Sequence, residues 1–160
     1  MTPSEIQNAV RDILAKDETL LAAGIEALTM DDGALKAAIG KAHALGGKGI
    51  VAIVSAPSFR PTSSAAKNAV GNVTMQVVVA ENPMTNRAQA GHLHALQAAE
   101  RIAWILNLTK PVPADPLCDV LVLDGQGIVP QPQEDGEGLI VGVTFRCQHQ
   151  LRGDPPTQTI

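Results

Sequence analysis

The strongest pattern in the sequence is an alternation of apolar and polar positions. Residues 73–80 and 139–150 have an apolar side chain at every second position, which predicts strands with one face on a core. Residues 49–55 (GIVAIVS) form a continuous apolar, β-branched run, which is typical of a strand covered on both faces. Residues 117–123 (LCDVLVL) predict a further strand, and residues 128–129 are a candidate for a short edge strand. The pattern therefore predicts a sheet of roughly four strands.

Apolar residues at three- and four-residue spacing predict helices in the other segments. The first helix is expected over residues 4–16, a short second one over residues 18–28 and a third over residues 32–45. The longest, over residues 88–108, is rich in alanine and ends shortly before Pro111. Its core-facing stripe is expected to comprise Leu93, Leu96, Ala99, Ile102, Ala103 and Leu106.

The order of these elements predicts an α+β fold in the form of a two-layer sandwich. The long helix is expected to pack on one face of a roughly four-stranded, mainly antiparallel sheet, with extra helices at the N-terminus. We expect one domain over residues 1–150, with the N-terminal helices in residues 4–45 and the sheet and main helix in residues 49–150. A flexible tail is expected over residues 151–160.

Composition narrows the classes of function. The chain is 45% hydrophobic but only 2% aromatic, so the core is aliphatic and an aromatic-lined ligand pocket is not expected. The net charge is -4 and the basic residues form no stripe, which disfavours nucleic-acid binding. No apolar run approaches the length of a membrane span, and the first residues (MTPSEIQNAVRD) contain no apolar signal core. We therefore expect a protein that is made and used in a cytoplasm.

The spacing of the histidines argues against a metal site. On the predicted helix, His92 and His94 would point about 200° apart, so they could not bind one ion together. The other two histidines, His43 and His149, are scattered along the chain. We therefore expect no metal and no other cofactor.

The usual motifs of nucleophilic catalysis are also missing from the sequence. Ser55 follows a strand but lacks the glycines of a nucleophile elbow, and the glycines in residues 46–49 precede a strand, whereas a phosphate loop follows one. Cys118 and Cys147 are expected to be buried and reduced, a disulfide between neighbouring strands being the alternative. Glu81 could be a catalytic carboxylate, but a lone acid beside a turn more often orders that turn through an arginine. The sequence favours a protein that is not an enzyme.

A family resemblance is centred on residues 71–108. A strand with alternating valines ends in Glu-Asn, and then come a proline, an Asn-Arg pair and an alanine-rich helix that ends in leucine. This arrangement resembles the tail terminator and tail-completion proteins of long-tailed bacteriophages and prophages, and residues 141–145 look like the final strand of that family. The resemblance covers roughly residues 49–150. The matching residues in the turn and helix are Val77, Val79, Glu81, Asn82, Pro83, Asn86, Arg87, Ala95, Ala99, Ile102 and Leu106.

The resemblance implies a structural role. Such proteins form a hexameric ring on the finished tail tube, stop its polymerisation and present a surface to head-completion, or neck, proteins. The implied partners are therefore further copies of the chain, the tail tube protein and a neck protein. The implied location is the head-proximal end of the virion tail, after assembly in the host bacterial cytoplasm. No catalytic, metal-binding or ligand-binding residues carry over, and neither a membrane nor a sequence-specific nucleic acid is implied as a partner.

Contacts with other subunits are expected at the turn over residues 81–87 and at two long polar connections, residues 56–70 and 124–138. The charged residues and asparagines of the turn exceed what a tight turn needs, although a cap for the main helix explains them equally well. The candidate residues of a subunit or tube interface are Glu81, Asn82, Asn86, Arg87, Phe59 and Arg60.

Two other functions fit the same residues less well. A small α+β enzyme or ligand-binding domain that dimerises through its sheet would need a pocket with converging polar groups, and the low aromatic content counts against it. The nearer alternative is another phage neck protein, located between head and tail.

Overall fold

The computed structural model describes residues 3–29, 48–65, 68–87, 91–116, 118–131 and 139–151. Its helices are α1 (Pro3–Ala15), α2 (Glu18–Ala22), α4 (Pro83–Arg87) and α5 (Ala95–Leu106). Its strands are β1 (Glu26–Thr29), β2 (Ile50–Val54), β3 (Ser58–Ala65), β4 (Asn68–Glu81), β5 (Val122–Gln131) and β6 (Leu139–Leu151). The predicted helix over residues 32–45 and residues 152–160 of the predicted tail lie outside the described residues.

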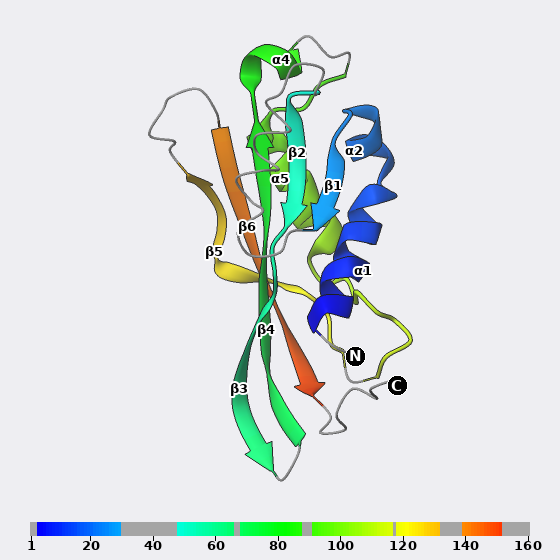
Figure 1. The fold of residues 1–160 in the computed structure, drawn as a ribbon, viewed down its shortest axis with the longest axis vertical. Helices are drawn as coiled ribbons and strands as arrows, with labels where there is room; N and C mark the ends of the chain where they lie inside the picture. Colours follow the sequence, from blue (N-terminus) through cyan, green and yellow to red (C-terminus); the bar gives the residue numbers. More distant parts are fainter. Residues whose placement is uncertain are drawn as a thin grey trace, which may run out of the picture.

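The strands in the described part of the chain form one six-stranded sheet in the order β1-β2-β4-β6-β5, with β3 also paired to β4. β1 and β2 are parallel, and every other pair is antiparallel. β2 pairs with residues 77–81 of β4, and β3 pairs with residues 68–74. The long strands β4 and β6 form the centre of the sheet (Figure 1).

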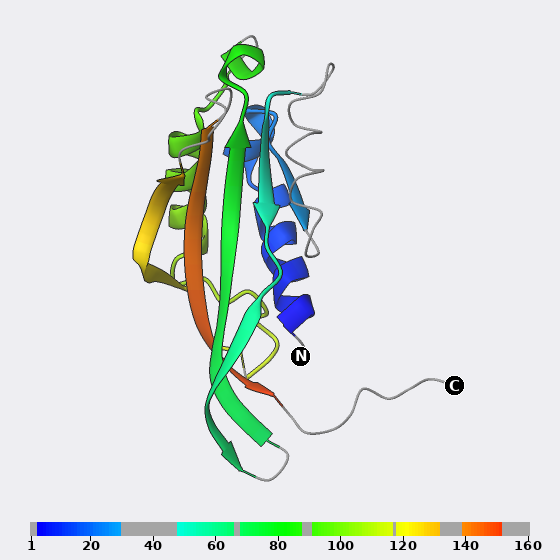
Figure 2. The ribbon, with the colours of Figure 1, turned by 60° about the vertical axis from the view of Figure 1, so that its left-hand side comes forward.

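The core lies between this sheet and the helices. The predicted apolar face of β4 is confirmed by the buried residues Val73, Met75, Val77 and Val79. The predicted face of β6 is confirmed for Val141, Val143, Phe145 and Cys147. Only Leu139 differs, because it is 36% exposed at the start of the strand. Paired antiparallel residues share a face, so β4 and β6 present one apolar surface, which α5 covers. α1 packs beside α5 and covers β1 and β2 (Figures 1 and 2).

The predicted loop over residues 56–70 is wrong, because β3 and the start of β4 form a β-hairpin there. This hairpin extends beyond the helices at one end of the molecule (Figures 1 and 2). A strand that has no core beside it needs no apolar alternation, and so its polar sequence carries no period-2 signal. The prediction of roughly four strands was too low partly for this reason.

The second half of the predicted helix over residues 18–28 is also wrong. α2 ends at Ala22, and Gly24 takes a left-handed φ of 74°. The chain then enters β1, which pairs in parallel with β2. A parallel partner is necessarily distant in sequence, so the local pattern could not indicate this strand.

The strand predicted over residues 117–123 begins later than expected. β5 starts at Val122 and includes the candidate edge strand at residues 128–129, with an irregular register against β6. The residues just before it bind the chain that follows α5: the N–H of Leu108 donates to the carbonyl of Leu121 at 2.7 Å. An edge strand with a register shift is a poor template for pairing with another sheet.

The main helix is shorter than the predicted range of residues 88–108. α5 begins at Ala95, after the N-cap residue His94, and residues 91–94 are not helical. Its buried face consists of Ala95, Ala98, Ala99, Ile102, Ala103 and Leu106. Leu96 was wrongly assigned to this face: it is 44% exposed, because it lies about 100° around the helix from Ala95.

The two thiols are expected to resist modification in the folded protein. Cys118 and Cys147 are free and buried, as the sequence predicted. Burial raises the pKa of Cys118 and, with the neighbouring Cys118 thiol adding to the effect, raises that of Cys147 to about 12. Because the thiolate is the reactive form, we expect no reaction with an aromatic disulfide reagent at pH 8 until guanidinium unfolds the chain. Rapid labelling of either thiol without denaturant would contradict this.

Candidate functional site

A buried carboxylate lies where β4 ends. Glu81 is 1% exposed, and its Oε2 accepts the backbone N–H of Ala95 at 2.7 Å. Its Oε1 accepts Nδ2 of Asn86 at 3.0 Å and lies 3.2 Å from Nδ1 of His94. Ala95 is the first residue of α5, so the carboxylate lies at the positive end of that helix dipole. Glu81 therefore caps the main helix from the neighbouring sheet.

Helix α4 positions the amide that binds this carboxylate. Oδ1 of Asn82 accepts the N–H groups of Met84 and Thr85 at 3.2 and 3.4 Å and so caps the start of α4. One turn later, Asn86 is fully buried, and its Nδ2 donates to the carbonyl of Leu93 at 2.7 Å as well as to Glu81. The amide thus links the end of β4 to the chain that leads into α5.

The close approach of β2 to α4 requires a glycine. Gly49 has a left-handed φ of 81°, and its carbonyl accepts the N–H of Asn82 at 2.6 Å. A Cβ added at Gly49 would lie 2.6 Å from the backbone nitrogen of Asn86. Any side chain there would be strained and would collide with α4.

The surroundings of Glu81 stabilise the ionised form of its carboxyl group. Burial by itself raises the pKa of this carboxyl, but hydrogen bonds from Asn86, Ala95 and His94 outweigh the burial, so its pKa lies below the ordinary value of 4.5. The group is therefore ionised at neutral pH, and donors of its own chain occupy both oxygens. The arrangement can hold α5 against β4, and it is poorly suited to proton transfer with a substrate.

The interface residues predicted at this turn fall into two groups. Glu81 and Asn86 are buried inside one chain, whereas Arg87 is exposed and Asn82 is half-buried. Among the described residues, Asn86 is the partner that orders the turn through Glu81. The prediction that Glu81 pairs with an arginine is therefore wrong. The alternative interpretation, a cap for the main helix, describes the observed geometry. The side chains at this turn that are exposed, and so accessible to another subunit, are those of Arg87 and Met84.

The two neighbouring histidines precede α5 and do not lie on it. The rings of His92 and His94 are in edge contact, with their centres 5.1 Å apart, so the prediction that they point apart is wrong. Across the residues that the structure describes, no group of three or more His, Cys, Asp and Glu is placed to hold a metal. His43 and the side chain of His149 lie outside the described part.

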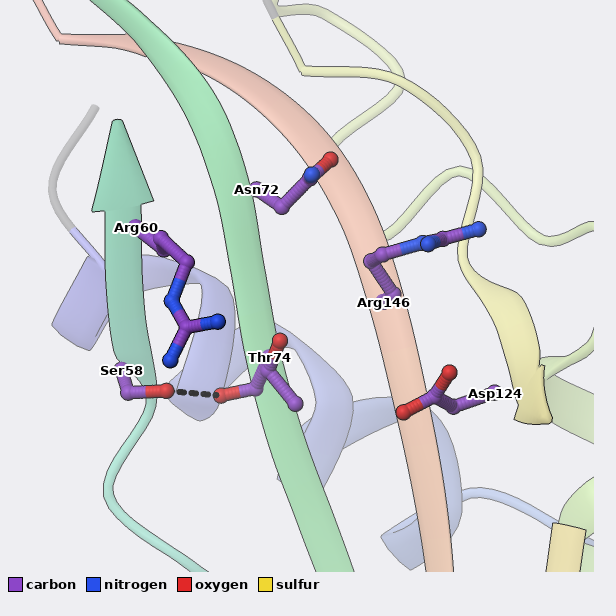
Figure 3. Close-up of a pocket in the computed structure, with 6 residues that line it drawn as sticks. All are labelled: Ser58, Arg60, Asn72, Thr74, Asp124 and Arg146. Carbon is purple, nitrogen blue, oxygen red and sulfur yellow. Dashed lines mark hydrogen bonds between the residues drawn. The ribbon is translucent and has the colours of Figure 1, made fainter. Parts of the chain in front are cut away.

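A polar hollow lies on the face of the sheet that α1 and α5 do not cover. Its volume is about 340 Å³, and we call it the arginine basin. Figure 3 shows the side chains that line it. Its lining residues are Ser58, Arg60, Asn72, Thr74, Asp124 and Arg146. Strand pairing builds the hollow: Ser58 pairs with Thr74, Thr74 pairs with Arg146, and paired residues share a face. Arg60 and Asn72 form the next row in the same way.

The sequence indicated only one residue of this basin as a site residue. Arg60 was a predicted interface residue and lies in it, whereas Phe59 is half-buried against the core on the opposite face. Arg146 and Asp124 were missed as site residues. The alternation in residues 139–150 did indicate that Arg146 faces away from the core. Its position beside Thr74 depends on the register between β4 and β6, which no local pattern shows.

Helix α5 also exposes the single tryptophan of the chain. Trp104 is 73% exposed, and the guanidinium of Arg101 lies 4.7 Å from its ring centre. Arg101 also binds Asp17, the N-cap residue of α2, at 2.7 Å, and this hydrogen bond lowers the pKa of Asp17. An exposed aromatic ring held by a neighbouring cation is a common feature of protein contact surfaces.

Comparison with known proteins identifies the fold. No protein-family model matches the chain, and no curated protein matches it. A solved structure with a similar fold is a chain from the "Virion of native gene transfer agent (GTA) particle", with a TM-score of 0.62 and 14% sequence identity. The match spans 91% of this chain and 94% of that chain, so the likeness in fold extends over nearly the full length of both. Within the described ranges, no helix is both long and apolar enough to cross a bilayer.

Proposed function

We propose that this protein is a non-enzymatic structural component of a bacteriophage or phage-like particle, and specifically a tail terminator. It caps the finished tail tube as a homo-hexameric ring, ends tube polymerisation and offers the surface to which the head joins. Its partners are further copies of itself, the tail tube protein and a neck protein. It resides at the head-proximal end of the tail and is assembled in the host cytoplasm.

The fold carries this proposal. The similar chain comes from a virion, and the likeness extends over nearly the full length of both chains. The turn over residues 81–87 and the helix after it add the resemblance to tail terminator and tail-completion proteins. The fold supports the class of virion proteins, and the turn and helix support tail completion within that class.

The surface of the molecule supports an assembly role. The β3–β4 hairpin extends beyond the helices, Trp104 is held in an exposed position on α5, and the arginine basin is open to solvent. The basin lies on strands β3, β4 and β6 and so adjoins the hairpin, whereas Trp104 lies on helix α5, which packs on the other face of the sheet. Exposed features on both sides of the sheet suit contacts with several neighbours. The buried carboxylate of Glu81, by contrast, serves the interior of one chain.

A neck protein other than the tail terminator is the second candidate. The description of the similar virion chain names the particle and not a position within it, so the fold favours both candidates equally. A small enzyme or ligand-binding domain would have to use the arginine basin, whose hollow is open and whose two arginines are exposed. The open shape suits a contact with another protein better than the enclosure of a small substrate.

Ring formation tests the proposed function. A closed ring needs a heterologous contact that repeats around an axis, and a hexameric tube calls for a cap of the same symmetry. We expect hexameric rings in negative-stain electron micrographs and in light scattering, at high protein concentration or on purified tail tubes, and no binding to duplex DNA at physiological salt. A protein that stays monomeric or dimeric even with tail tubes present would refute the tail terminator assignment.

A further inference from the structure

The arginine basin is charged in a way that specifies its partner. Arg60 and Arg146 come from different strands and lie on either side of β4, with Asn72 and Thr74 between them (Figure 3). Asp124 enters from β5 on the Arg146 side. Both arginines are exposed, and a guanidinium presents a fork of donors that fits a carboxylate. The basin is therefore built to bind carboxylates.

A protein segment fits this basin better than DNA does. Duplex DNA presents a uniform row of negative phosphates, and Asp124 would repel one of them. A peptide can place carboxylates at the two arginines and a backbone N–H at Asp124. The hydroxyls of Ser58 and Thr74 and the amide of Asn72 supply further donors and acceptors to a peptide backbone. The mixed chemistry of the basin thus favours an acidic peptide.

The chain itself contains such a peptide. Residues 132–138 (PQEDGEG) include three carboxylates, those of Glu134, Asp135 and Glu137. The segment connects the end of β5 to the start of β6 and carries no lysine or arginine. We propose that the arginine basin of one subunit binds residues 132–138 of a neighbouring copy of this chain. The proposal rests on the ring of the proposed function and names the contact that would close it.

The segment cannot reach both arginines of its own subunit. Leu139, where β6 begins, pairs with Glu81, whereas Arg146 pairs with Thr74. Arg146 lies seven positions after Leu139, which is about 23 Å along the strand, and Arg60 lies farther along the sheet. A loop of this length that is anchored at both ends reaches at most about 13 Å from its anchors. A contact of the segment with both arginines therefore joins two subunits, and such a heterologous contact is the type that closes a ring.

Charge reversal tests the contact. One variant carries Arg60→Glu and Arg146→Glu, and a second carries Glu134→Arg, Asp135→Arg and Glu137→Arg. We expect either variant alone to lower ring affinity about a hundredfold, since like charges would then face each other across the contact. An equimolar mixture should form rings again, because each reversed basin meets a reversed segment in an alternating, even-numbered ring.

Matched controls separate this contact from general effects. The variant Lys16→Glu with Lys48→Glu makes the same change in net charge outside the basin and should form rings normally. Each variant should keep the melting temperature of the unmodified chain, because the reversed arginines are exposed and the reversed acids lie in a connection between strands. Ring formation is measured under the conditions in which the unmodified chain forms rings, free or on tail tubes.

The outcomes distinguish this inference from the proposed function. Rings formed by the basin-reversed variant alone would overturn the inference and leave the function standing. Loss of rings without rescue in the mixture would overturn the assignment of residues 132–138 as the occupant. Binding of duplex DNA by the unmodified chain that disappears in the basin-reversed variant would assign the basin to phosphate and overturn the inference. Failure of the unmodified chain to form rings even on tail tubes would refute the function itself.

Discussion

Replacing Glu81 with alanine should lower the free energy of unfolding by about 3–5 kcal/mol, one of the two largest effects that the structure predicts for a single substitution. The carboxylate is 1% exposed and accepts the first N–H of α5 and the amide of Asn86. Without it, both donors would remain buried without an acceptor, and the helix dipole would lose its negative partner. Urea denaturation followed by circular dichroism measures the effect.

Two further substitutions make this result interpretable. Glu81→Gln keeps the size of the side chain but turns one acceptor oxygen into a donor, so it should cost about 2–3 kcal/mol. Glu100→Ala removes an exposed glutamate from α5 and should change stability by about 0.5 kcal/mol or less. Equal stability of the Glu81→Ala and Glu100→Ala variants would show that the carboxylate does not hold the helix.

The contribution of Glu81 should also depend on pH. Its pKa in the folded protein lies below the ordinary value of 4.5, so the folded state favours the ionised form. The stabilisation is therefore fully present above about pH 4.5 and is lost as the pH falls through the folded pKa. The stability difference between the unmodified chain and Glu81→Gln should shrink over that acidic range. A difference that stays constant from pH 7 to pH 3 would contradict this assignment.

Replacing Phe145 with alanine should cost about 3–5 kcal/mol, because it removes a large side chain from the centre of the core. Phe145 is fully buried on the face of β6 that packs under α5. The remaining core is aliphatic and close-packed, so the surrounding side chains could only partly fill the cavity. Thermal and urea unfolding should both show the lower free energy of unfolding.

Leu96→Ala is the matched control for this substitution. The sequence pattern placed Leu96 in the core-facing stripe of the main helix, and a buried leucine there would cost about 2–5 kcal/mol to truncate. The structure leaves Leu96 44% exposed on the outer side of α5, so its truncation should cost about 0.5 kcal/mol or less. A large loss of stability for Leu96→Ala together with a small loss for Phe145→Ala would contradict the orientation of α5 described above.

The elements that face the core were the predictable ones. α1, β2 and β6 were predicted within one or two residues, and β4 was predicted from Val73 onward, because the apolar period on each element matches the face that it buries. β1, β3 and most of β5 were missed for a common reason. A short parallel strand, a projecting hairpin and a bulged edge strand bury too little surface to impose a period on their sequences.

The candidate sites show the same division. The turn over residues 81–87 was recognised as important from its residue types, and the interpretation as a helix cap was available. The burial of Glu81 and Asn86 could not be predicted, because it depends on how Gly49, α4 and the start of α5 meet. Arg60 was named from a segment thought to be a loop, and its neighbour Arg146 lies 86 positions later in the chain.

By itself, the sequence determined the aliphatic core, the α+β class and the inward faces of the two central strands. These properties depend on side-chain type and local period, which a linear chain carries directly. The tertiary structure alone decided that Glu81 is an internal cap, that Leu96 faces solvent and that Arg60 and Arg146 share a hollow. Register and helix rotation are set by packing between distant segments, and the free energy of that packing belongs to no single stretch of sequence.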